Sequence, residues 1–204
     1  MKEFISTLLF LFVLTTVFAQ ETFNNARHSL PEIIKYESNF NSILGDTVDF
    51  RIQEYPSKES ANSISTTSYI FDRVNDTFIP RLHVWYHFDD NAHELIGVRY
   101  SWGLYNPSFD ANRNRPLLEK LASDEKSFRK KYSQIHEDRK KEFGVETRNE
   151  IIVDAEHAYI QEITWELDDK IIELSISFTR EIQDFPGIGL AANQFNIEEF
   201  IRFK

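Results

Sequence analysis

The chain of 204 residues contains no cysteine and only one methionine. The lack of cysteine excludes disulfides, thiol nucleophiles and cysteine-ligated metal ions. Basic residues are also in the minority, because 23 Lys and Arg stand against 33 Asp and Glu and give a formal net charge of -10. Since nucleic-acid affinity depends on Lys and Arg neutralising phosphates, this balance argues against nucleic acid as a partner. It equally disfavours binding to anionic membrane surfaces.

Long apolar runs are absent after the N-terminus. The stretch from Phe4 to Phe18 is almost wholly apolar, and Val17 and Ala19 fit the small positions before a signal-peptidase cleavage site. We therefore predict a signal peptide over residues 1–19 and an exported mature chain, periplasmic or extracellular, over residues 20–204. The alternative is an N-terminal membrane anchor, but the run is shorter than the roughly 20 residues of a spanning helix. No membrane insertion is expected after cleavage.

Short motifs for catalysis and for cofactor binding are also missing. There is no Gly-x-Ser-x-Gly elbow, and Gly187-Ile188-Gly189 has no phosphate-loop context. We expect no cofactor, and the sequence assigns no catalytic residue. At this length a single domain is the default, and no low-complexity linker divides the chain.

Two segments have helical patterns. The first covers about residues 30–44, with Pro31 in its first turn and Gly45 at the C-cap position. The second is long, covers about residues 116–143 and is ended by Gly144. Its apolar stripe consists of Leu117, Leu121, Phe128, Tyr132 and Ile135. Its remaining faces are rich in both charges, which favours a solvated surface with local ion pairs over a docking face for an acidic partner.

Strand patterns follow each helix. Residues 46–55 alternate between apolar and polar side chains, and strands over residues 65–74 and 77–88 are expected to be joined at a two-residue Asn75-Asp76 turn. That turn would place Tyr69 opposite Leu82.

The segment RLHVWYHFDDNAHELIGVRYSW, residues 81–102, predicts a further hairpin. Its even-numbered apolar residues must face one another, which a three-residue loop at residues 90–92 achieves. This register would pair Tyr86 with Ile96 and set Trp85 opposite Gly97.

The C-terminal part predicts another hairpin. A two-residue turn at Asp168-Asp169 would pair Trp165 with Ile172 and leave one wet face. The segment 194–203 fits either a strand or a helix, and we favour the strand.

Together these patterns predict an α+β fold. An antiparallel sheet of hairpins and meanders would carry one N-terminal helix and one long central helix on one face. The order of a helix followed by hairpins occurs twice, so the domain divides naturally into halves of about residues 28–105 and 115–204. The sequence leaves the strand order and the oligomeric state open.

The residues His87, Asp89 and His93 form a candidate metal site near the hairpin tip. Two imidazoles and one carboxylate can bind zinc or ferrous iron. Against this, the spacing matches no compact ligand motif, and exposed tips rarely supply the outer hydrogen bonds that metal sites need. A solvated polar tip is the simpler interpretation.

The residues His83, Trp85 and Arg99 form a candidate ligand-binding site. Alternation places all three on the less apolar face of the hairpin, where a Trp beside donors can stack a sugar or anchor a peptide. The alternative is that a second layer covers this face.

A third polar cluster, Asp154, Glu156 and His157, contains a carboxylate–histidine pair suited to acid–base work. Loop clusters of this kind are far more often solvated, and we favour that interpretation. The sequence therefore supports two hypotheses for the function. The first is an exported, non-enzymatic module that binds a protein, peptide or glycan; the second is a metal-assisted or acid–base hydrolase centred on residues 87–93.

Overall fold

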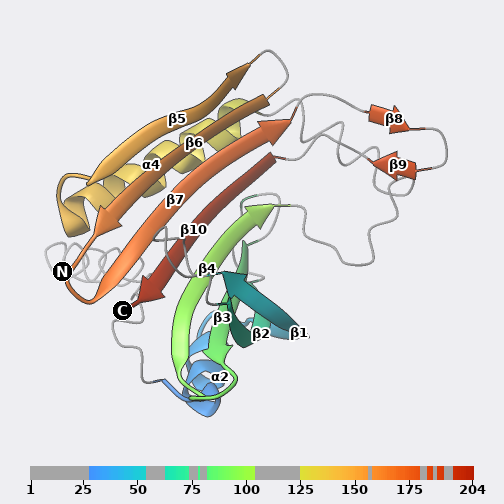
Figure 1. The fold of residues 1–204 in the computed structure, drawn as a ribbon, viewed down its shortest axis with the longest axis vertical. Coiled ribbons are helices and arrows are strands. Elements are labelled where there is room, and N and C mark those ends of the chain that lie inside the picture. Colours follow the sequence, from blue (N-terminus) through green and yellow to red (C-terminus); the bar gives the residue numbers. More distant parts are fainter. Residues whose placement is uncertain are drawn as a thin grey trace, which may run out of the picture.

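The computed structural model shows an α+β protein whose described residues form two helices and an eight-stranded antiparallel sheet, which confirms the predicted fold class (Figure 1). The helices are α2 (Leu30–Ser38) and α4 (Glu125–Phe143). The strands are β1 (Ile43–Gln53), β2 (Ser63–Arg73), β3 (Leu82–Asp89), β4 (Leu95–Gly103), β5 (Arg148–Ala155), β6 (Ala158–Glu166), β7 (Lys170–Thr179) and β10 (Phe195–Phe203), with a separate pair β8 (Gln183–Phe185) and β9 (Ile188–Leu190). The structure describes residues 28–53, 63–73, 78, 82–103, 125–155, 158–179, 183–185, 188–190 and 195–204.

The sheet has the order β1-β2-β3-β4-β10-β7-β6-β5. Each helix is followed by four strands of this sheet, and the last strand of each set, β4 or β10, lies at the centre. These two strands pair antiparallel, with Tyr100 opposite Glu199. Strands β1 and β5 therefore form the two outer edges.

Helix α2 is shorter than predicted. Its start is held by Ser29, whose backbone N–H donates to the Glu32 carboxylate at 2.8 Å, and Pro31 lies in the first turn. The prediction was wrong beyond Ser38, because Asn41 takes a positive φ of 50° and the chain enters β1 at Ile43. Gly45 consequently lies within a strand and is not a helix cap.

Helix α4 ends as predicted at Phe143. Gly144 takes φ +84°, the left-handed conformation that a glycine adopts without a steric penalty, and its N–H donates to the Lys140 carbonyl. Its charged faces carry local ion pairs, Arg129 with Glu125 and Lys141 with Asp138. The apolar stripe is buried at Phe128, Tyr132 and Ile135, whereas the predicted first turns over 116–124 lie outside the described residues.

The C-terminal pairings agree with the predictions. Trp165 faces Ile172, and the chain turns at Asp168-Asp169 between Leu167 and Lys170, whose backbone groups share a hydrogen bond. Segment 195–203 is a strand and inserts between β7 and β4.

The N-terminal registers differ from the predictions. Tyr69 faces Tyr86 and not Leu82, so the register is not the one that a turn at Asn75-Asp76 would set; the predicted turn itself lies outside the described residues. In the next hairpin the even-numbered residues do face one another, but the register is shifted by two, so Tyr86 pairs with Val98 and His87 stands opposite Gly97.

The physical reason for the second shift lies at the hairpin tip. Asp89 Oδ1 accepts hydrogen bonds from the backbone N–H groups of Asn91 and Ala92, and His93 takes φ +54°. These interactions, with a bulge between His87 and Phe88, widen the loop.

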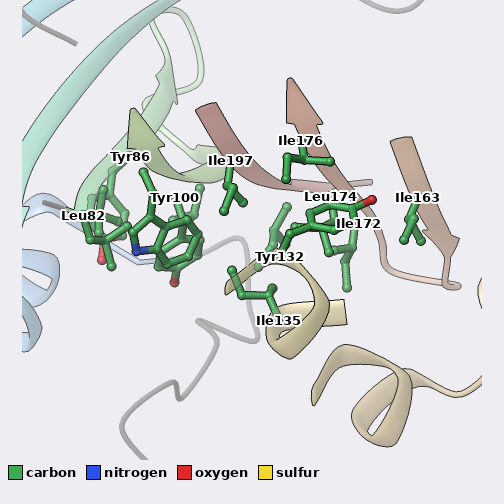
Figure 2. Packing of buried hydrophobic residues seen from close by; sticks show 14 of the residues in the cluster. Leu82, Tyr86, Tyr100, Tyr132, Ile135, Ile163, Ile172, Leu174, Ile176 and Ile197 are labelled. Carbon is green, nitrogen blue, oxygen red and sulfur yellow. The ribbon is translucent and has the colours of Figure 1, made fainter. Parts of the chain in front are cut away.

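The hydrophobic core fills the space between the sheet and the two helices. Figure 2 shows Tyr132 and Ile135 of α4 beside strand residues such as Leu174 and Ile197. Each fully buried aliphatic or aromatic side chain of this kind contributes about 1.5–3 kcal/mol. In the described part of the chain, no helix is long and apolar enough to cross a membrane.

Two buried ion pairs cross this core and tie each helix to the sheet. Arg73 of β2 donates to the Glu37 carboxylate of α2 at 2.7 and 3.1 Å, and the Tyr86 hydroxyl donates to the same carboxylate at 2.5 Å. Arg139 of α4 donates to Glu199 of β10.

Candidate functional site

The candidate site lies on the face of the sheet opposite the helices, where β3, β4 and β10 are adjacent. In this face Trp85 stands opposite Arg99, and His83 stands opposite Ser101. Strand β10 brings Phe200 to the other side of Arg99. The structure therefore brings together His83, Trp85 and Arg99, the three residues proposed to bind a ligand.

Arg99 is held by aromatic rings. Its guanidinium carbon lies 5.1 Å from the centroid of the Phe200 ring and 6.0 Å from that of Trp85. Both distances are within the range of cation–π attraction. The Nε atom of Arg99 is buried and has no hydrogen-bond partner among the described residues.

The charge of Arg99 is not neutralised by a carboxylate in the part of the chain that the structure describes. Every other arginine whose side chain is described contacts a glutamate: Arg73, Arg129, Arg139, Arg148 and Arg202. Within the described residues, the guanidinium of Arg99 therefore has no carboxylate to accept from its N–H groups.

The two other proposed ligand-binding residues have structural roles. Trp85 is only 4% exposed, so its ring supports the guanidinium of Arg99 and is not open to a stacking sugar. The Nδ1 atom of His83 lies 2.5 Å from Asp72 Oδ1, which occupies that nitrogen.

Strand β10 contributes residues that the sequence did not indicate. Arg202 lies on the other side of Phe200, with its guanidinium carbon 5.9 Å from the ring centroid, and it binds Glu173 at 3.0 Å. Asn196 accepts a hydrogen bond from Ser101 at 3.3 Å. These residues are about 100 positions from Arg99 in the sequence, and no local pattern connects them.

His87 lies beside this site, on the same face of β3 as Trp85. It is 1% exposed, its Nδ1 shares a hydrogen bond of 2.7 Å with Ser68 Oγ, and its ring meets the edge of Phe200. Burial, and secondarily the Arg99 cation, lower the pKa of His87 to about 3. His87 is therefore neutral at every pH at which proteins normally work.

The three proposed metal ligands have separate environments. His87 is buried against Ser68, Asp89 Oδ1 caps the turn, and His93 lies exposed within that turn. Among the described residues, no group of three His, Asp or Glu side chains could hold a metal ion.

Asp89 and His93 instead border a hollow at the hairpin tip. It has a volume of about 400 Å³ and is lined by Ser29, Leu30, Thr67, Tyr69, Phe88, Asp89, Asp90 and His93. Hydrogen bonds from the hydroxyls of Ser65 and Thr67 lower the pKa of Asp90, so its carboxylate is charged but already satisfied.

The third cluster is only partly described. Asp154 lies exposed in β5, while 156 and 157 lie outside the described residues. Comparisons with protein-family models, with curated proteins and with solved structures found no match for this chain.

Proposed function

We propose that this protein is an exported, non-enzymatic binding module that holds a carboxylate of an acidic peptide or protein partner on Arg99. Export rests on the signal-peptide pattern of residues 1–19. The single observation that supports the binding site is that Arg99 is oriented by aromatic rings yet has no carboxylate partner among the described residues.

The geometry favours a carboxylate over a neutral sugar. A guanidinium presents planar donors that match the two oxygens of a carboxylate. A sugar would need an accessible aromatic ring to stack on, and the most suitable ring, Trp85, is buried. Phe200 is partly exposed and lies between Arg99 and Arg202, so it can pack against the apolar part of an acidic side chain.

The local charge also differs from that of the whole molecule. The chain carries a formal net charge of -10, which repels acidic partners at long range. At the site, however, Arg99 and Arg202 lie on either side of Phe200, and among the described residues a carboxylate pairs with Arg202 and none pairs with Arg99. We expect binding to be specific for this patch and to weaken as ionic strength rises.

A peptide titration tests the proposal. A fluorescently labelled peptide rich in glutamate is titrated with the protein and compared with the same peptide carrying glutamine at every glutamate position. We expect the acidic peptide to bind and Arg99→Gln to weaken this binding by roughly 10- to 100-fold, since hydrogen bonds to charged groups contribute about 1.5–3 kcal/mol.

The matched control is Arg129→Gln, which removes an arginine from α4 on the opposite side of the sheet. This variant should bind the acidic peptide like the unmodified protein. The proposal is refuted if the glutamate and glutamine peptides bind equally, if neither binds, or if both arginine variants behave alike.

A further inference from the structure

Strand β5 ends the sheet on one side. It pairs with β6 and with no other described strand, so the backbone N–H and C=O groups along its outer edge have no strand partner in the described chain. All eight of its residues are exposed except Val153, which is partly buried. An open edge of this kind is a template for pairing with another strand.

The middle of β5 is apolar. Ile151 is 56% exposed and Ile152 is 49% exposed, and Val145, just before the strand, is 78% exposed. These are three of the six large hydrophobic side chains that are exposed in the described chain. Isoleucine strongly favours strands, so these side chains would pack well against a further strand.

The charges of β5 are arranged so that the strand is complementary to itself. Arg148 begins the strand and contacts Glu150 two residues on at 3.0 Å, and Asp154 lies next to the last residue. In an antiparallel pair of two copies with Ile151 opposite Ile151, Arg148 of each copy stands opposite Asp154 of the other. A parallel in-register pair would place like charges together, which is unfavourable.

The bulge in β5 does not remove this match. The register to β6 shifts between Ile151 and Val153, which leaves Ile152 as the extra residue. The bulge belongs to the ladder with β6, whereas a second copy would pair along the opposite, outer edge of β5.

We propose that the β5 edge is a self-association surface whose partner is β5 of a second copy of this chain. The two sheets would join antiparallel across a two-fold axis. Each copy would supply the same surface, so the assembly closes as a dimer and does not extend into a fibre. Strand β1 forms the other edge, and among its residues whose side chains the structure describes the exposed apolar ones are Ile43 and Leu44.

Sedimentation velocity over a concentration series tests this proposal. The single variants Arg148→Glu and Asp154→Arg each place like charges together at both ends of the interface. We expect each to weaken the dimer about tenfold or more, because cross-strand charge pairs change from attractive to repulsive. The double variant restores opposite charges and should restore the dimer.

Lys35→Glu is the control, since it changes the charge equally at an exposed position of α2, which is bound to β2 in the other half of the sheet. It should leave the dimer intact. Circular dichroism on every variant checks that the fold is kept, and Ile151→Lys provides a second test at the centre of the interface if a charge variant unfolds.

Three results would overturn the proposal. The first is a protein that stays monomeric up to about 1 mM, the weakest association that such a dimer would represent. The second is a dimer that survives both single variants and Ile151→Lys, or whose loss the double variant fails to reverse. The third is an open series of growing oligomers, which would indicate heterologous contacts between different edges. Peptide binding at Arg99 is measured separately, so either proposal can fail alone.

Discussion

Buried, neutral His87 should make the protein sensitive to acid. In the folded state its pKa is about 3, because the ring is buried beside Arg99 and packed against Trp85 and Phe200. In the unfolded chain the pKa returns to about 6.5. The unfolded state therefore binds more protons between these values, so the free energy of unfolding falls as the pH is lowered through this window.

The magnitude follows from the two pKa values. At pH 8 neither state is protonated at this position, and the contribution is near zero. At pH 5 the folded His87 is still neutral while the unfolded histidine is almost fully protonated, so the free energy of unfolding should be about 2 kcal/mol lower than at pH 8. The folded pKa scarcely affects this figure, because it lies well below 5.

Urea unfolding at several pH values between 8 and 5 measures the effect. His87→Asn removes the titrating group while keeping a polar group near Ser68 Oγ. Between pH 8 and pH 5, the free energy of unfolding of this variant should therefore fall by about 2 kcal/mol less than that of the unmodified protein. His93→Asn is the control, because it makes the same substitution at an exposed histidine and should not remove the loss that His87 causes. If the His87→Asn and unmodified proteins lose stability in parallel as the pH falls, the reasoning is refuted.

Two further predictions concern stability at neutral pH. Glu37→Gln should lower the free energy of unfolding by about 3–5 kcal/mol, because the buried Arg73 loses its counter-ion. The control is Glu137→Gln at an exposed position, which should change the free energy of unfolding by less than about 0.5 kcal/mol. Equal urea midpoints for the two variants would contradict the stabilising role of the Glu37–Arg73 pair. Gly97→Ala should lower the free energy of unfolding by about 1–3 kcal/mol, because the added Cβ would lie 2.8 Å from the Phe200 ring and 2.9 Å from a backbone oxygen. An unchanged thermal midpoint would show that β4 and β10 can move apart without a loss of stability.

The contact at Gly97 also shows why the predicted register of the β3–β4 hairpin was wrong. From the hairpin alone, Trp85 was expected to stand opposite this glycine, but His87 does so, and the ring that would collide with a Cβ there belongs to Phe200. The correct register depends on the bulge at His87 and on the hydrogen bonds of Asp89 at the tip. Neither feature changes which residues are apolar, so alternation could not reveal it.

The candidate site was partly predictable for the same reason. Alternation correctly placed His83, Trp85 and Arg99 on one face, because side chains along a strand point to opposite sides in turn. It could not show that Trp85 is buried or that His83 is occupied by Asp72. Those facts depend on neighbouring strands.

The sequence by itself determined the features that depend on a few adjacent residues. These are the α+β class, the end of α4 at Gly144, the turn at Asp168-Asp169 and the pairing of Trp165 with Ile172. Each follows from local backbone preference or from the period of the apolar pattern, which a single segment carries within itself.

Only the tertiary structure decided that β10 lies between β4 and β7. That placement brings Phe200 and Arg202 to Arg99 and joins on one face residues about 100 positions apart in the sequence. The physical reason is that the order of distant strands depends on the apolar surface that they bury together in the core. This shared burial depends on the whole chain and not on any single segment.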